Sequence, residues 1–177
     1  MPPHLHLPSG PGPLRHTTTL ETGDHMRVLI GTDGSDDAIA AAVAGLALLA
    51  PPDEVILTCA AEAPIEATSG LESGFAGGMA TDTEVDAAWT VARKDADAAL
   101  RRTAASLPEG LSVDSVVLLG DPGPALCQLA QERSADAVVL GSRGLGAIRR
   151  ALLGSVSTYV SANAPCPVVI VRSGTDS

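Results

Sequence analysis

Aromatic residues and lysine are scarce in this sequence. Trp, Tyr and Phe occur once each among 177 residues, although 45% of the residues are hydrophobic. The core must therefore be built from small aliphatic side chains, which favours helices packed closely on a sheet. Ten of the eleven basic residues are Arg, and Lys94 is the only lysine. Because no Gly-Lys-Ser/Thr sequence is present, P-loop enzymes and kinases, which need a lysine at the phosphates, are excluded.

Histidine is absent from the part of the chain predicted to fold. All four histidines lie within the first 25 residues: His4, His6, His16 and His25. His4 and His6 are spaced to bind a metal weakly, but scattered histidines in a tail are usually inert. Without a histidine base or a metal site, acyl transfer and metal-dependent hydrolysis lack their reacting groups. We therefore expect a binding protein and not an enzyme.

Signals for export or membrane insertion are also missing. The first 25 residues are rich in Pro and polar residues and have no apolar run typical of a signal peptide. The longest apolar run, residues 38–50, is shorter than the roughly 20 residues of a membrane helix and predicts a buried helix. The cysteines form no CxxC motif and have apolar neighbours, as reduced buried thiols do: Cys59, Cys127 and Cys166. We expect a cytoplasmic protein.

The overall charge is acidic. The formal net charge is −10 at pH 7, with 21 acidic and 11 basic residues. Such a protein repels phosphate backbones and anionic lipid surfaces. We therefore expect neither nucleic acid nor a membrane as partner.

Composition divides the chain into a tail and one domain. Residues 1–25 have many turn-forming residues and no periodicity, which predicts a flexible tail, and Met26 is a second candidate start of translation. We expect the folded domain over 26–173 and a short tail over 174–177. The Gly-rich segment 62–81 predicts a loop that could close over a site.

Apolar runs alternate with helical patterns after residue 26. The predicted strands cover 27–32, 54–60, 112–119, 137–142 and 167–172, and the predicted helices cover 35–49, 82–107, 124–133 and 156–163. This alternation predicts a single-domain α/β fold with a parallel sheet and helices on both faces. The third strand alternates partly between apolar and polar residues, which places it near an edge.

A glycine-rich stretch, GSRGLGAIRRALLGS over 141–155, follows the fourth predicted strand. Ligands of open α/β sheets bind at the carboxyl ends of the strands. We expect Gly141 and Gly144 to form tight turns, and Gly154 and Ser155 to begin a helix whose first amides bind an anion, with the Ser155 hydroxyl at the cap. The alternative is that the glycines only form turns and Ser155 only caps the helix.

Three arginines lie in the same stretch: Arg143, Arg149 and Arg150. They provide local positive charge within an acidic protein, which favours a polyphosphate ligand. Bare amides and a helix N-terminus can hold phosphate without lysine.

The spacing Gly-x2-Gly-x9-Gly-Ser, preceded by ADAVVL and followed by ANAPCPVVIVR, resembles the ATP-binding signature of the universal stress protein family. VLIGTDGSDDAIAAA resembles the first strand and helix of that family, and VVLLGDPGPALCQLA its third strand and next helix. The resemblance covers roughly Met26 to Arg172. It implies a Rossmann-like five-stranded parallel sheet in the order 3-2-1-4-5 and a homodimer paired through the last strand.

The resemblance also implies a set of binding residues. Those expected at the adenosine are Gly31, Thr32, Asp33, Ala60, Leu140 and Gly141. Those expected at the phosphates are Ser142, Arg143, Gly144, Gly154, Ser155 and Val156. Asp33 is the candidate ligand of an ATP-bound Mg²⁺. Ala60 is smaller than the aliphatic residue often found in ATP-binding members, which implies a looser contact with adenine.

These observations predict an ATP-binding stress or signalling module with little or no catalytic turnover. Slow ATP hydrolysis at Asp33 is a minor variant of this hypothesis. One alternative is a dimeric protein-interaction module of the same fold that binds no nucleotide. Another is a relative of electron-transfer flavoproteins that holds AMP or FAD. The stress, the protein partner, the dimer affinity and the role of residues 1–25 stay open.

Overall fold

The computed structural model describes residues 25–62, 81–144 and 153–172. Several predicted features lie outside these ranges: the tail up to residue 24, nearly all of the loop over 62–81, Arg149, Arg150 and the C-terminal tail.

The described residues form the alternating pattern of strands and helices that the sequence predicts. In chain order the elements are β1 (Arg27–Gly31), α1 (Asp36–Leu46), β2 (Glu54–Ala61), α3 (Asp82–Ala104), β3 (Val113–Leu119), α4 (Pro122–Glu132), β4 (Ala137–Gly141), α5 (Ser155–Asn163) and β5 (Val168–Val171). The strands form one parallel sheet in the order β3-β2-β1-β4-β5. The predicted fold class and strand order are confirmed.

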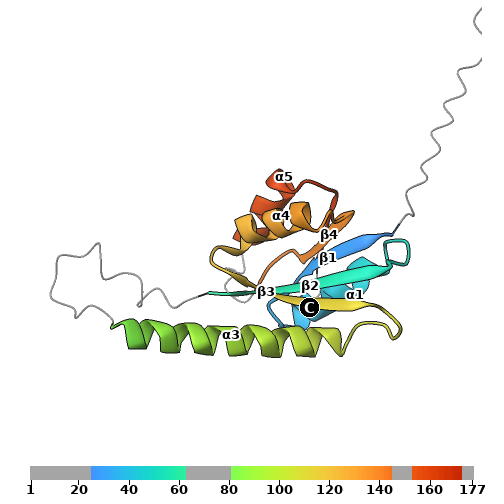
Figure 1. The fold of residues 1–177 in the computed structure, drawn as a ribbon. Helices are drawn as coiled ribbons and strands as arrows, with labels where there is room; N and C mark the ends of the chain where they lie inside the picture. The colour runs from blue at the N-terminus through green and yellow to red at the C-terminus, as the bar shows by residue number, and fades with distance from the viewer. Residues whose placement is uncertain (1–24, 63–80, 145–152, 173–177) are drawn as a thin grey trace, which may run out of the picture.

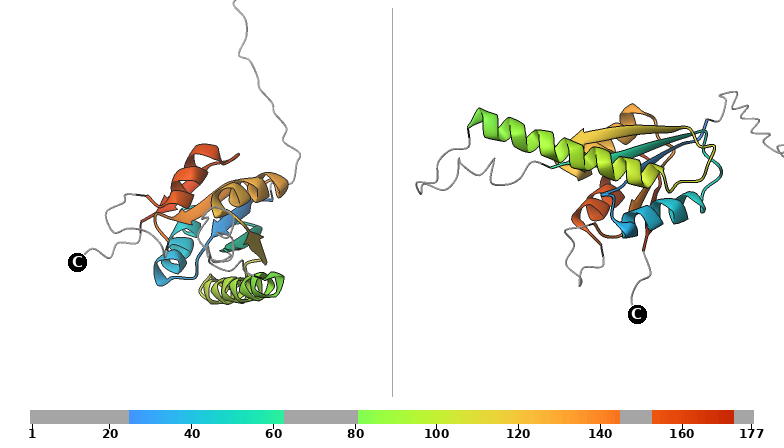
Figure 2. Two further views of the ribbon diagram at one scale, coloured as in Figure 1. Left: turned by 90° about the vertical axis from the view of Figure 1, so that its left-hand side faces the viewer. Right: turned by 90° about the horizontal axis from the view of Figure 1, so that it is seen from below.

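Helices cover both faces of the sheet. Figure 1 shows α1 and α3 on one face and α4 and α5 on the other, and Figure 2 shows the same layers from two further sides. One buried cluster lies under α1 and α3 and includes Val28, Ile30 and Leu57. The other lies under α4 and α5 and includes Leu29, Ile56 and Leu126. Alternate residues of one strand therefore enter opposite cores, as strand geometry requires.

The edge strands are β3 and β5. Every residue of β5 is partly exposed, whereas three consecutive residues of β1 are fully buried. The prediction that the third strand lies at an edge is confirmed by its position next to β2 alone.

Three of the helices begin at a side chain that caps the first turn. Ser35 accepts the Ala38 N–H at the start of α1, and Asp121 accepts the Gly123 N–H at the start of α4. Because Asp121 caps α4 and Pro122 occupies its first position, this helix begins two residues before the predicted one. At α3, a reciprocal capping box joins Thr81 and Glu84.

Two helices end three residues earlier than predicted, for the same reason. Helix α1 ends at Leu46, and the N–H groups of Leu48 and Leu49 then bond carbonyls three residues back. Helix α3 ends at Ala104 with the same pattern over the next turn. These tightened last turns keep the apolar periodicity of a helix, so a sequence pattern includes them.

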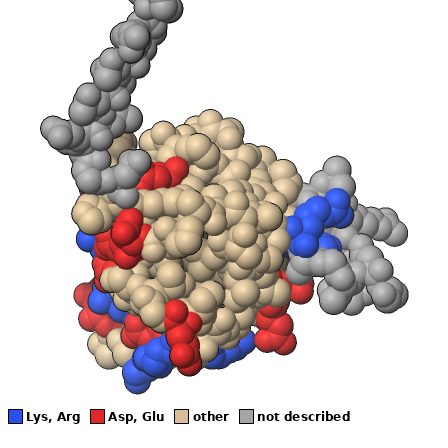
Figure 3. Space-filling view, turned by 90° about the vertical axis from the view of Figure 1, so that its right-hand side faces the viewer, with Lys and Arg blue, Asp and Glu red and all other residues tan. Residues whose placement is uncertain are grey.

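Figure 3 views the molecule from the side where the strands begin. Charged side chains lie mostly around the rim of this face, and the area between them is uncharged. The opposite end, where the strands finish, carries the cavity.

Candidate ligand-binding cavity

A cavity of about 680 Å³ opens at the carboxyl ends of the central strands. Figure 2 (left) looks onto this end of the sheet. Ten of the twelve predicted site residues line the cavity: Gly31, Thr32, Asp33, Ala60, Leu140, Gly141, Arg143, Gly144, Ser155 and Val156. Ser142 and Gly154 do not. Segments that are far apart in the sequence therefore meet at one site, as the rule for open α/β sheets predicts.

The backbone at the end of β1 is held by threonines. The Thr32 N–H donates to the Thr58 carbonyl at 2.9 Å. The Thr32 hydroxyl lies 3.0 Å from the hydroxyl of Thr103 on α3 and accepts the Gly34 N–H at 3.0 Å. Thr103 is fully buried and donates to the Ala99 carbonyl at 2.9 Å. This buried network connects the floor of the cavity to α3.

Asp33 lies between β1 and α1 but does not cap the helix. Its Oδ1 accepts the Ser35 N–H at 3.0 Å and the Ser35 hydroxyl at 2.6 Å. Ser35 in turn is the N-cap of α1. These bonds fix the Asp33 carboxylate at the cavity wall, close to the loop after β4.

The glycines of the motif do not have the positive φ angle that favours glycine over other residues. Among the described residues, positive φ angles at glycine occur at Gly34, Gly110 and Gly120, outside the motif. A left-handed backbone is therefore not the reason for glycine at Gly141 and Gly144, and the expectation that they form tight turns stays a prediction. Lack of space favours glycine at both positions. A Cβ at Gly141 would lie 3.2 Å from the Arg143 carbonyl oxygen, and a Cβ at Gly144 would lie 3.0 Å from Asp33 Oδ2.

Gly154 differs from the other two. Its φ of −72° suits any residue, and an added Cβ would meet protein atoms only at 3.6 Å or more, which is ordinary contact. The nearest atoms would be the Arg143 Cα and the Ser142 carbonyl oxygen at 3.6 Å, and the Gly144 nitrogen at 3.9 Å. Among the described residues, neither the backbone conformation nor a close contact requires glycine at this position.

Gly154, and not Ser155, is the N-cap of α5. Ser155 is the first helical residue, so its predicted position at the cap is wrong by one residue, and no side chain caps this helix. The Gly154 N–H donates to the Ser142 carbonyl at 2.8 Å, and the Ser142 N–H donates to the Val171 carbonyl at 2.8 Å. Ser142 is buried. Gly154 and Ser142 therefore hold the start of α5 against the end of β4.

The start of α5 forms one end of the cavity. Ser155, Val156 and Ser157 line it, together with Arg143. The first amides of a helix have no intrahelical acceptor and carry partial positive charge. The Ser157 hydroxyl donates to the Gly141 carbonyl at 2.7 Å, which fixes the helix start relative to the loop. The arrangement suits an anion.

Sequence reasoning did not find the wall that α3 provides. Ala92, Asp95, Ala96 and Ala99 line the cavity from this helix. Small residues at intervals of three or four in the predicted helix 82–107 indicated a face that a neighbour could approach closely, but not that this face lines a cavity. Further lining residues that were missed come from the ends of β2 and β3 and from α4: Thr58, Cys59, Glu62, Leu118, Pro122 and Leu126.

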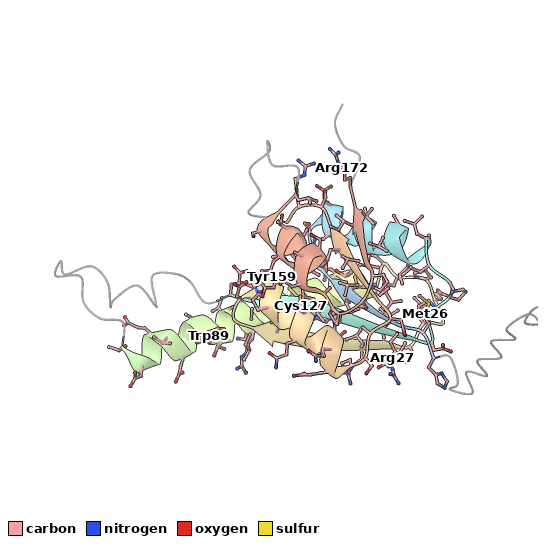
Figure 4. All side chains as sticks on the ribbon, turned by 90° about the horizontal axis from the view of Figure 1, so that it is seen from above. Met26, Arg27, Trp89, Cys127, Tyr159 and Arg172 are labelled. Carbon is pink, nitrogen blue, oxygen red and sulfur yellow. The ribbon has the colours of Figure 1, made fainter. Side chains whose placement is uncertain are left out.

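The thiols are poor nucleophiles. Burial, together with the Asp33 and Glu62 carboxylates, raises the pKa of Cys59 to about 11. Burial also raises the pKa of Cys127 and Cys166. All three cysteines are free. Figure 4 shows Cys127 on α4, in the helix layer away from Trp89 on α3.

Comparison with known proteins decides the family. The profile of the Universal stress protein family matches residues 25–172. The chain belongs to the universal stress protein family. It is 26% identical over 149 residues to a universal stress protein of Methanocaldococcus jannaschii, a match that covers 84% of this chain and 82% of the relative. It is 49% identical over 59 residues to a relative from Thermus aquaticus, which covers 33% of this chain and 43% of the relative.

Several curated relatives match this universal stress protein over less than half of their length, 24% in the case of a Mycobacterium tuberculosis protein. Among solved structures, UspA from Lactobacillus plantarum has a TM-score of 0.66 and 21% identity, covering 84% of this chain and 98% of the other. A family protein from Arabidopsis thaliana, solved with AMP bound, has a TM-score of 0.56 and 17% identity, covering 85% and 94%. In the described parts of the chain, no helix has the length and apolar character needed to cross a membrane.

Proposed function

We propose that this universal stress protein binds ATP with Mg²⁺ in the cavity and acts as a nucleotide-responsive stress or signalling module. The observation that carries this proposal is Gly154, the N-cap of α5 beside the cavity, where a Cβ would meet no described atom closer than 3.6 Å. Glycine at this position leaves space for a ligand to approach the start of the helix closely.

The phosphates would lie at the start of α5. The amides of Ser155 and Val156 are donors there, Arg143 adds positive charge, and Gly144 allows the loop to approach closely. Ser142 and Gly154 would not contact the phosphates through hydrogen bonds, unlike the expectation from the sequence. The hydrogen bond between them aligns the loop with the helix. Gly154 would leave space for the phosphates, but its amide already donates to the Ser142 carbonyl.

A Mg²⁺ ion would offset the repulsion between the phosphates and the Asp33 carboxylate. This carboxylate lies at the same wall as Gly144 and would repel a bare polyphosphate. Within the ranges that the structure describes, no group of three or more His, Cys, Asp or Glu side chains could hold a metal ion by itself. A Mg²⁺ would therefore depend on phosphate oxygens for its ligands, with Asp33 contributing from the protein.

The nucleoside would occupy the cavity over the ends of β1 and β2. Gly31 and Thr32 form its floor, and Ala60 lies opposite Leu118 of β3. A Cβ at Gly31 would collide with the side chain of Leu140, so these two residues shape the floor together. The AMP bound to the related Arabidopsis protein supports a nucleotide as the class of ligand.

Catalytic turnover would be slow or absent. The cysteine at the cavity is protonated at neutral pH, since its pKa is raised to about 11. Asp33, already bonded to Ser35, is the only candidate among the predicted site residues for activating water. Three free thiols agree with a reducing cytoplasm as the location of the protein.

We also propose a homodimer that pairs through β5. This strand lies at the edge of the sheet, and its four apolar residues are all partly exposed. An uncovered apolar edge favours pairing with another strand. Sedimentation equilibrium at micromolar concentration is expected to give a dimer, and a monomer throughout would contradict this part of the proposal.

Calorimetric titration with ATP, with and without Mg²⁺, tests the proposed ligand. We expect binding that strengthens with Mg²⁺ and that is lost in Gly154→Val, whose side chain would project beside the Gly144 amide. Ala162→Val is the matched control, because this residue lies on the exposed surface of the same helix and outside the cavity. Absence of binding in the unsubstituted protein would favour the interaction module that uses no nucleotide.

A further inference from the structure

Charge is divided between the two ends of the cavity. Arg143 and the start of α5 line the end next to β4. Glu62 and Asp95 line the end next to β2 and α3. Both acidic side chains belong to exposed residues. Asp33 lies between the two ends, after β1.

The strand order separates these ends. Strand β1 lies between β2 and β4 in the sheet. Neighbouring strands are about 4.8 Å apart, which puts the end of β2 roughly 10 Å from the end of β4. Helix α3 packs mainly against β2 and β3, so Asp95 belongs to the side of the cavity away from α5. The cavity therefore has a positive end and a negative end at a fixed separation.

We propose that Glu62 and Asp95 make the cavity selective for nucleotides that carry all of their phosphate at the 5′ position, and that they reject nucleotides with a second phosphate on the 2′ or 3′ oxygen of the ribose. The inference rests on the proposed function, which places the 5′-phosphates at α5. The ribose and base then lie toward β2 and α3.

The selection has a simple electrostatic cause. A phosphate on the 2′ or 3′ oxygen adds up to two negative charges at the nucleoside, close to two carboxylates and far from Arg143. The hydroxyls of an unmodified ribose, by contrast, are donors that carboxylates accept. Because Glu62 and Asp95 are exposed, salt screens the repulsion, and the discrimination is strongest at low ionic strength.

A matched pair of ligands separates this effect from total phosphate content. ADP and adenosine 3′,5′-bisphosphate each have two phosphates on the same nucleoside, placed differently. Calorimetry at low ionic strength without Mg²⁺ is expected to give ADP an affinity on the order of tenfold higher. Raising the salt concentration should reduce this ratio.

Two variants of the full chain test whether Glu62 and Asp95 cause the preference for ADP. The double variant Glu62→Gln, Asp95→Asn keeps the size of both side chains and removes their charge, and it should bring adenosine 3′,5′-bisphosphate to within about threefold of ADP. Asp97→Asn, on the same helix but outside the cavity, removes one charge and should leave the ratio unchanged.

The outcomes separate this inference from the proposed function. If neither ADP nor ATP binds even when Mg²⁺ is present, the proposed function fails. If ADP binds and adenosine 3′,5′-bisphosphate binds equally well, the nucleotide site stands and the inference is wrong. A large preference for ADP that persists in the double variant would also overturn it, because the cause would then be steric.

Discussion

Gly34 is the residue whose replacement should destabilise the loop between β1 and α1 most. Its φ is +72°, a left-handed conformation that costs an L-residue about 1–2 kcal/mol. A Cβ there would lie 2.5 Å from the Cβ and 2.7 Å from the Cα of Ala99 on α3. Moving a helix backbone to relieve such overlap costs about 1–3 kcal/mol. The Gly34 carbonyl also accepts a hydrogen bond from Arg102, so any shift disturbs a second contact.

We therefore expect Gly34→Ala to lower the free energy of unfolding by about 2–5 kcal/mol, a large part of the 5–15 kcal/mol of an ordinary domain. Urea denaturation followed by the fluorescence of Trp89, the only Trp, measures it. The control is Gly110→Ala, with a φ of +86° and no atom within 4 Å of its Cβ. Gly110→Ala has the same left-handed backbone strain as Gly34→Ala but no overlap of its Cβ with another residue. Equal losses in the two variants would refute the packing argument.

Three further predictions concern the cavity and its support. Thr103→Val removes a buried hydroxyl that bonds both Thr32 and the Ala99 carbonyl, and should cost about 1–2 kcal/mol in urea denaturation; a loss below about 0.3 kcal/mol would contradict the network. Folding raises the pKa of Cys59 to about 11. The stability that the protonated Cys59 thiol contributes is therefore complete below pH 9 and is lost as the pH rises toward 11. The unfolding free energy should therefore fall more steeply over that range than in Cys59→Ala, and parallel curves would count against it. Iodoacetamide at pH 8 should modify Cys59 much more slowly in the folded protein than in urea, and equal rates would show an accessible thiol.

Much of the fold could be predicted because the three central strands, β1, β2 and β4, are short and largely apolar. The runs at 54–60 and 137–142 lie within about one residue of β2 and β4. Such strands, buried on both faces, are recognisable without knowledge of their neighbours. Helix ends were less predictable, since the turn after α1 continues the apolar pattern while its hydrogen bonds change.

The site could be predicted only in part. The spacing of Gly141, Gly144 and Gly154 located one end of the cavity, because strand-end position and glycine content are both visible in the sequence. The sequence could not tell why each glycine is there, since glycine serves backbone conformation and close packing alike. The α3 wall was not found because small residues on a helix do not reveal what packs against them.

Gly154→Ala gives the most direct test of nucleotide binding. The substitution adds one methyl group in ordinary contact with the protein, and the loss of stability should stay near 0.5–1 kcal/mol, as for a change at a helix cap. The account predicts that the unsubstituted protein binds MgATP in calorimetry and that Gly154→Ala, still folded, binds it at least tenfold more weakly. Equal affinity in the two proteins would contradict the assignment of the phosphates to the start of α5.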